Sequence, residues 1–288
     1  MFKINNFVNN DDIDIIAEKG PFKVAQYKRD LSVSPATAMN AYFCDEMNIR
    51  KRQVICDLSK SAGIICQSGA MQWTVGNVNA TTGVKGAGDF LGKLVKGKVT
   101  GESAIKPEYV GDGLLVLEPT YRHIILLDTS AWNGRVVLDD GLFLACDASI
   151  KQKLVARSNV SSAVLGGEGL FNLALEGMGV AVLECRCPQE ELIEVELIND
   201  VLKVDGNFAI AWSDTLSFTV ERSGKTLVGS AASGEGFVNV YRGSGKVLLA
   251  PVDRTIGGLT NPATPTSGGS KAAGALGSLL GGIAEALD

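Results

Sequence analysis

The fold is decided by Gly167-Glu-Gly-Leu-Phe-Asn172 and the Gly177-Met-Gly179 that follows it, because this pattern occurs three times. An earlier copy has Gly101-Glu-Ser103 and then Gly111-Asp-Gly113, and a later copy has Gly234-Glu-Gly236 and then Gly243-Ser-Gly245. The copies are 66 and 67 residues apart, and the distance from Gly-Glu to Gly-x-Gly is 10, 10 and 9 residues. This agreement indicates an internal repeat.

Each copy predicts a β-hairpin: a short strand of alternating apolar residues, a Gly-x-Gly turn that tolerates a positive φ, and a β-branched or leucine-rich strand. The repeat extends upstream, where residues 142–150 match 208–216 and their alanines, Ala145 and Ala211, are again 66 apart. In the first copy the matching stretch is expected at 65–73, followed by a glycine- and lysine-rich insertion at 82–98.

The composition favours an all-β protein. Hydrophobic residues make up 45% of the chain and charged residues only 20%, with 34 glycines, which suits many short strands and tight turns. We therefore expect three pseudo-repeated antiparallel units of β-sandwich or β-helix-like type in a pseudo-threefold arrangement, with short helices only at the insertion and the C-terminus.

The expected organisation has four parts. The three-unit β-domain spans 48–254, with units at about 48–125, 126–191 and 192–254, and it follows an N-terminal preamble, 1–47, of mixed pattern. A flexible linker is expected at 255–271, because this stretch is rich in Gly, Pro, Ser and Thr.

The last segment, 272–288, has a stripe of apolar residues at helical spacing. Its members, which form a candidate partner-docking tail, are Leu276, Leu279, Leu280, Ile283 and Leu287. Four glycines oppose an isolated helix. Two interpretations stay open: a disordered tail, or a helix that forms on a protein partner, a neighbouring subunit or a membrane surface.

The N-terminus lacks the apolar core of a secretory signal, and no apolar run is long enough to span a membrane, so a cytoplasmic location is expected. The six cysteines are then expected to be reduced and to act as small buried hydrophobes. Cys185 and Cys187 would place two thiols on one face of a strand, but zinc needs four ligands. The single histidine, His123, lies in a strand pattern. We expect no catalytic residues, no metal and no cofactor.

Four stretches within roughly 48–253 stand out together: Gly69-Ala-Met-Gln-Trp73, the insertion ending Gly101-Glu-Ser103, Gly167-Glu-Gly-Leu-Phe-Asn172 and Gly206-Asn-Phe-Ala-Ile-Ala-Trp212. In these stretches the chain resembles the altered inheritance of mitochondria protein 24 family, including its bacterial members. The resemblance implies a pseudo-threefold β-structure whose units are similar to the tryptophan RNA-binding attenuation protein fold, with no established biochemical activity. The mitochondrial branch is associated with inner-membrane organisation, and both ends of this chain lie outside the likeness.

Two sets of side chains are candidates for ion binding. Glu102, Glu168 and Glu235 occupy one position of the repeat and would bind a divalent cation if they converged, but each is better explained as an acceptor of backbone N–H groups in its own turn. A candidate anion or lipid-headgroup contact is formed by Lys93, Lys96 and Lys98. The insertion lacks the Gly-Lys-Ser/Thr ending of a phosphate-binding loop, which weakens that assignment.

The one dense basic cluster is Arg50-Lys51-Arg52, which we interpret as a solvated strand entry rather than an RNA contact. The net charge of −5 also argues against a polyanionic partner, so no nucleic acid is expected. The sequence therefore favours a non-enzymatic, homo-oligomeric β-repeat scaffold or partner-binding protein. The alternative is a small-ligand, anion or lipid-surface binding module that uses the insertion, and RNA binding comes third.

Overall fold

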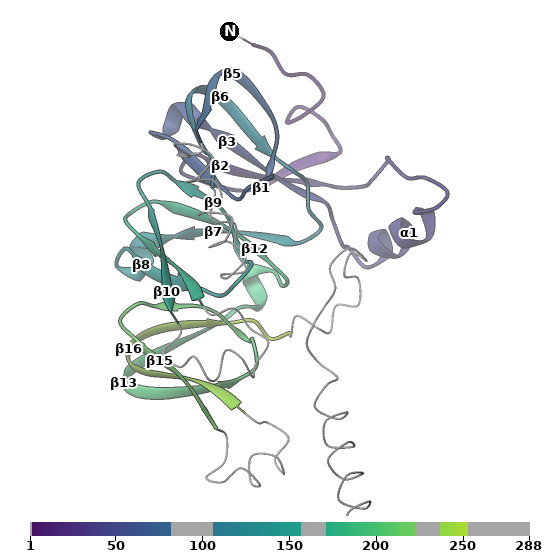
Figure 1. Ribbon diagram of the computed structural model, residues 1–288. Helices are drawn as coiled ribbons and strands as arrows, with labels where there is room; N and C mark the ends of the chain where they lie inside the picture. Colours follow the sequence, from purple (N-terminus) through teal and green to yellow (C-terminus); the bar gives the residue numbers. More distant parts are fainter. Residues whose placement is uncertain (1, 82–105, 157–170, 223–236, 253–288) are drawn as a thin grey trace, which may run out of the picture.

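The structure is a computed structural model that describes residues 2–81, 106–156, 171–222 and 237–252. Every strand pair in these segments is antiparallel, and the strands form two sheets (Figure 1). The expected all-β, antiparallel class is confirmed. Along the molecule, β1–β3, β5 and β6 lie at one end, β7, β9 and β12 in the middle, and β13, β15 and β16 at the other end.

The first sheet has the order β1-β2-β3-β6-β4-β9-β12-β7, with β5 paired to β6. Its strands are β1 (Ile13–Lys19), β2 (Phe22–Tyr27), β3 (Arg52–Asp57), β4 (Ile64–Cys66), β5 (Met71–Thr81), β6 (Glu108–Leu117), β7 (His123–Asp128), β9 (Phe143–Asp147) and β12 (Val180–Cys185). Short 3-10 turns, η1 (Leu58–Lys60) and η2 (Thr129–Trp132), follow β3 and β7.

The second sheet has the order β10-β11-β8-β14-β16-β13, with β15 paired to β16. Its strands are β8 (Arg135–Leu138), β10 (Lys151–Ala156), β11 (Phe171–Glu176), β13 (Ile193–Asp205), β14 (Ala209–Ser213), β15 (Ser217–Arg222) and β16 (Phe237–Leu249). A third 3-10 turn, η3 (Gln189–Glu191), precedes β13.

The Gly-x-Gly motifs do not turn hairpins, so that prediction is wrong. Gly111 and Gly243 lie inside the continuous strands β6 and β16, and Gly177 links β11 to β12, which belong to different sheets. These three first glycines have φ values of 127°, 130° and 120°. A positive φ redirects the backbone without reversing it, and at Gly177 the chain passes from the second sheet to the first.

A β-bulge occurs in three strand pairs, β5–β6, β9–β12 and β14–β16, and each pair includes the strand segment that follows a Gly-x-Gly. The register shifts between Met71 and Trp73, between Phe143 and Ala145, and between Ala209 and Ala211. Strand β14 begins 66 residues after β9, and β15 begins 66 residues after β10. The same local irregularity of the backbone thus occurs at three places in the described chain.

The sequence alignment of 65–73 with 142–150 needs a correction. Ile65 pairs with Cys146, so β4 and β9 are neighbours in the sheet rather than equivalent strands. The bulge instead makes the start of β5 equivalent to β9, because Trp73 and Ala145 occupy the same position relative to it. Sequence comparison alone can align apolar strands of similar length in more than one way, and the hydrogen-bond register shows which alignment is correct.

The buried apolar residues form several clusters, and the central cluster contains residues of both sheets. Leu138, Leu175 and Leu183 are fully buried at its centre, and Phe22 and Leu117 are fully buried toward the β1–β6 end. At the opposite end, Trp212 stacks on Phe218 and meets Tyr241 edge-on, with centroids 5.4 and 5.3 Å apart. These apolar layers hold the outer strands and so fix which strand edges remain exposed.

The N-terminal preamble contributes to the first sheet, because β2 pairs with β3 along Phe22–Gln26. It also contains a helix, α1 (Ala38–Glu46), that projects sideways from the sheets (Figure 1). Helices were expected only at the insertion and the C-terminus, so that part of the prediction is wrong. No described helix is long and apolar enough to cross a membrane.

Candidate functional site

The segment 28–50 between β2 and β3, which we call the helical arm, is the most exposed apolar part of the described chain. No α1 side chain is buried, and Met39 and Met47 are each 73% exposed. The arm's exposed large apolar side chains are Leu31, Val33, Met39, Tyr42, Phe43, Met47 and Ile49. Apolar residues are spread around the helix rather than confined to one stripe, so packing on the body could bury only some of them.

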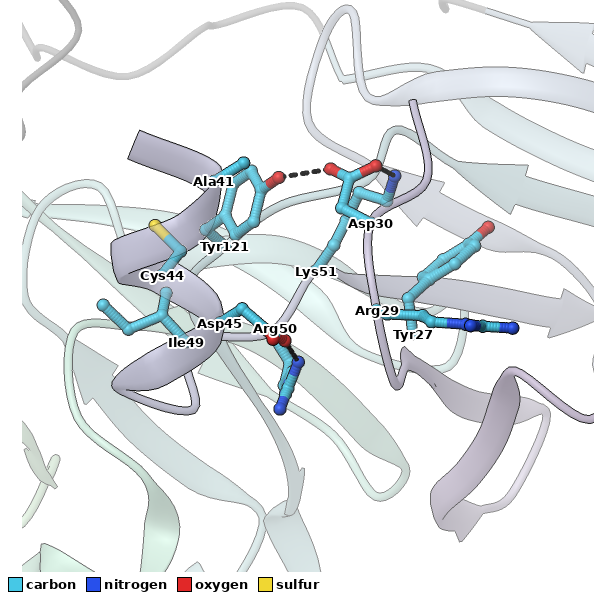
Figure 2. A pocket seen from close by; sticks show the side chains of 10 residues that line it. All are labelled: Tyr27, Arg29, Asp30, Ala41, Cys44, Asp45, Ile49, Arg50, Lys51 and Tyr121. Atoms are coloured by element: carbon cyan, nitrogen blue, oxygen red, sulfur yellow. Dashed lines mark hydrogen bonds and ion pairs between the residues drawn. The ribbon is translucent and has the colours of Figure 1, made fainter. Parts of the chain in front are cut away.

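The base of the arm is fixed by Asp30. The Tyr121 hydroxyl donates to Asp30 Oδ2 at 2.6 Å, and Lys51 Nζ lies 3.3 Å from Asp30 Oδ1 (Figure 2). The Ser32 amide also donates to Oδ1 at 3.1 Å. The Tyr121 hydrogen bond, helped by Ser32 and Lys51, lowers the pKa of Asp30, and the same bond raises the pKa of Tyr121 to about 12.

A small cavity lies between the arm and the sheet. Its lining includes Tyr27, Cys44 and Ile49 together with the Asp30 group (Figure 2). The cavity volume is about 20 Å³, which is room for a single water molecule rather than for an organic substrate. Its basic side chain Arg50 pairs with Asp45, so the charges at the cavity are compensated from within the chain.

The basic cluster 50–52 belongs to the same region, and its interpretation as a solvated strand entry is wrong. Arg52 is only 7% exposed, and its guanidinium donates to the carbonyl oxygens of Arg50 at 3.2 Å and Arg122 at 3.4 Å. Lys51 sits 4.7 Å from the centre of the Tyr27 ring besides meeting Asp30. These contacts direct the positive charges inward, so the cluster is poorly placed to meet an RNA backbone.

The cysteines mostly behave as expected. Five of the six are buried, and Cys44 in the arm is half-buried. Cys185 Sγ and Cys187 Sγ are 3.7 Å apart, and burial raises the pKa of Cys187 to about 12, with Cys185 adding to the shift. A thiol with this pKa is protonated at neutral pH, which disfavours its reaction with electrophiles.

His123 begins β7, which confirms its place on a strand, and burial followed by the charge of Arg52 lowers its pKa. Within the segments that the structure describes, no three His, Cys, Asp or Glu side chains come together as a metal site.

Three sets of candidate residues lie outside the described residues: the lysines Lys93, Lys96 and Lys98, the repeat glutamates Glu102, Glu168 and Glu235, and the tail residues Leu276, Leu279, Leu280, Ile283 and Leu287. The helical arm, in contrast, was not predicted as a site. Its signal was present in the sequence as a density of Met, Tyr and Phe in 39–47, without the spacing that marks one buried face.

Comparison with known proteins places this β-structure among relatives. The profile of the family described as mitochondrial biogenesis AIM24 matches residues 47–252. An uncharacterized protein of Streptococcus pyogenes serotype M6 is 31% identical over 201 residues, which cover 67% of this chain and 78% of that protein. The crystal structure of another Streptococcus pyogenes protein is similar with a TM-score of 0.53 and 25% identity, over 71% of this chain and 89% of that chain.

Proposed function

This chain belongs to the mitochondrial biogenesis AIM24 family, and on that premise we propose that it is a non-enzymatic scaffold that assembles into a homo-oligomer. The scaffold is built from three pseudo-repeated β-units in a pseudo-threefold arrangement. The recurring bulges and the shared φ of Gly111, Gly177 and Gly243 support this relationship between the units.

The observation that carries the oligomer is the apolar surface of the helical arm. Monomeric proteins in water rarely expose a contiguous group of large apolar side chains, because their contact with water is unfavourable. Met39, Tyr42 and Phe43 are all more than half exposed on α1. The Asp30 contacts with Tyr121 and Lys51 hold the arm in place, so this surface is presented in a fixed position. A second copy of the chain would remove it from water.

The non-enzymatic part of the proposal is supported by the cavity under the arm. It has room for about one water, and its charged groups are engaged by each other rather than directed at an open space. A scaffold needs only complementary surfaces, which fits a site whose polar groups serve to fix the arm.

Native mass spectrometry of the full-length protein over a range of concentrations tests the proposal. We expect a discrete oligomer without bound small molecules, and a monomer at every concentration would overturn it. A reproducible stoichiometric extra mass would instead favour the ligand-binding alternative. The variant Met39→Gln/Tyr42→Gln/Phe43→Gln is expected to weaken the oligomer, whereas Met178→Gln, an equally exposed apolar site elsewhere, serves as its control.

A further inference from the structure

Two junctions hold successive units of the chain together, and both use the same strand register. In the first, Ile64, Ile65 and Cys66 of β4 pair with Asp147, Cys146 and Ala145 of β9. In the second, Val136, Val137 and Leu138 of β8 pair with Ser213, Trp212 and Ala211 of β14. The flanking hydrogen bonds also correspond: the Gln67 amide donates to Leu144 O at 2.8 Å, and the Asp139 amide donates to Ile210 O at 2.9 Å.

Each junction joins a strand of one unit, β4 or β8, to a strand of the next unit, β9 or β14 respectively. In the last unit the equivalent of β4 and β8 is the second half of β13, because Leu202 pairs with Tyr241 as Val136 pairs with Leu175 and Ile64 with Tyr109. In the first unit the equivalent of β9 and β14 is the start of β5, which carries the same bulge. The two halves of a third junction therefore exist in one chain.

These two halves are far apart and unpaired on their outer edges. Strand β5 lies at one end of the molecule and β13 at the other (Figure 1). In the described segments, residues 71–75 pair only with β6 and residues 201–205 only with β16. Thr74 and Lys203 are exposed, whereas their counterparts in the internal junctions, Cys146 and Val137, are buried.

We propose that the β13 edge of one copy pairs with the β5 edge of a second copy, in the register of the internal junctions. Leu202 then lies opposite Val75, Lys203 opposite Thr74 and Val204 opposite Trp73. The pairs Leu202–Val75 and Val204–Trp73 place apolar side chains on one face of the joined sheet, where they would pack against each other. This inference rests on the proposed homo-oligomer and adds a second contact between copies to the one that the helical arm makes.

The contact is head-to-tail, since two different edges meet. Such an interface leaves a free β5 edge on one copy and a free β13 edge on the other, so association continues until a ring closes or a filament grows. Unprotected antiparallel edges are ready templates for this pairing. The second copy is favoured over an unrelated peptide because both edges already match a junction that the chain uses twice.

The backbone direction at Thr74 provides a selective way to block the contact. Leu144 and Ile210 direct their carbonyl oxygens across the internal junctions, and backbone groups two residues apart point to the same edge. Gln72 is the equivalent residue in β5, so Thr74 also directs its amide outward. Proline at position 74 would remove that donor and leave the pairing with β6 in place.

We would measure the mass of full-length Thr74→Pro beside Thr74→Val, which keeps the amide. Thr74→Pro is expected to raise the dissociation constant between copies about a hundredfold, while Thr74→Val leaves it unchanged. The thermal transition of each variant would be recorded, so that loss of the fold is not mistaken for loss of the contact.

Disulfide cross-linking tests the register itself. In a Cys44→Ser background, Thr74→Cys/Lys203→Cys treated with diamide should form a ladder of multimers on a non-reducing gel, because opposed residues lie about 5.5 Å apart between Cα atoms. Thr74→Cys/Glu196→Cys uses the other half of β13 and should give no ladder. An oligomer in which the ladder fails and Thr74→Pro has no effect would overturn the edge pairing alone. A monomer at every concentration would overturn the scaffold proposal as well.

Discussion

The hydroxyl of Tyr121 donates a 2.6 Å hydrogen bond to Asp30, a residue 91 positions earlier in the chain. This bond joins the base of the helical arm to the segment between β6 and β7. Lys51, at the other end of the arm, reaches the same carboxylate, so Asp30 fixes both ends of the arm. The exposed helix α1 is thus carried on an ordered base, and the position of its apolar surface depends on a few polar contacts.

Removal of the Tyr121 hydroxyl should loosen the arm. Tyr121→Phe deletes the principal group that lowers the pKa of Asp30, so this pKa should rise toward its ordinary value. Because Tyr121 is 47% exposed, we expect a loss of at most about 1 kcal/mol in unfolding free energy. Hydrogen exchange should become faster in 28–50, and Tyr42→Phe is the control. Unchanged exchange in the arm would contradict the anchoring role.

The pair Glu221–Arg242 predicts a specific acid response. Two hydrogen bonds of 2.6 and 2.9 Å from Arg242 lower the pKa of Glu221 from 4.5 to about 2. A lowered pKa in the folded state means that the pair stabilises the protein above pH 4.5 and that this contribution fades as the pH falls toward 2. Carbon-detected NMR titration should show it, with Arg242→Lys raising the pKa. A Glu221 pKa near 4.5 in the parent protein would refute the pairing.

Two repeat glycines should differ in their tolerance of alanine. A Cβ at Gly177 would collide with the Ser149 carbonyl oxygen, whereas at Gly243 the nearest atom is 3.7 Å away. Both have positive φ, so Gly243→Ala should cost about 1–3 kcal/mol from backbone strain alone. Gly177→Ala should cost more than about 3 kcal/mol or prevent folding. Urea denaturation compares them, and equal losses would show that the contact at Gly177 is relieved cheaply.

The thiols should divide into one reactive and five protected groups. Cys44 is half-buried in the arm, and the other five cysteines are buried. Burial raises the pKa values of Cys66 and Cys146 to about 12, which keeps them protonated near neutral pH. Ellman's reagent at pH 7.5 should therefore label one thiol per native chain, and Cys44→Ser should abolish the labelling. Labelling of several thiols before unfolding would contradict the packing.

Much of the fold is local in origin and could be read from the sequence. Alternating and β-branched apolar runs predict strands, and the glycine motifs at Gly111, Gly177 and Gly243 mark places where the backbone needs a positive φ. The six scattered cysteines were likewise recognised as packing residues, which five of them are. These properties depend on side chains and backbone within a few residues of each other.

Which neighbour each strand pairs with depends on residues that are distant in the sequence. A positive φ is compatible with a hairpin and with a bend between layers, and only the register of β6, β12 and β16 with their neighbours distinguishes the two. The basic cluster is similar: Arg52 looks solvated until the Arg122 carbonyl, 70 positions away, is brought to its guanidinium.

The sequence by itself thus determined the β class, the repeat spacing and the family resemblance, because these follow from short-range pattern. Only the tertiary structure decided that Ile65 neighbours Cys146, that Asp30 anchors an exposed helix, and that β5 and β13 each keep one unpaired edge in the described segments. Edge pairing and side-chain anchoring depend on which surfaces remain after the core has packed, and that is set by the whole chain at once.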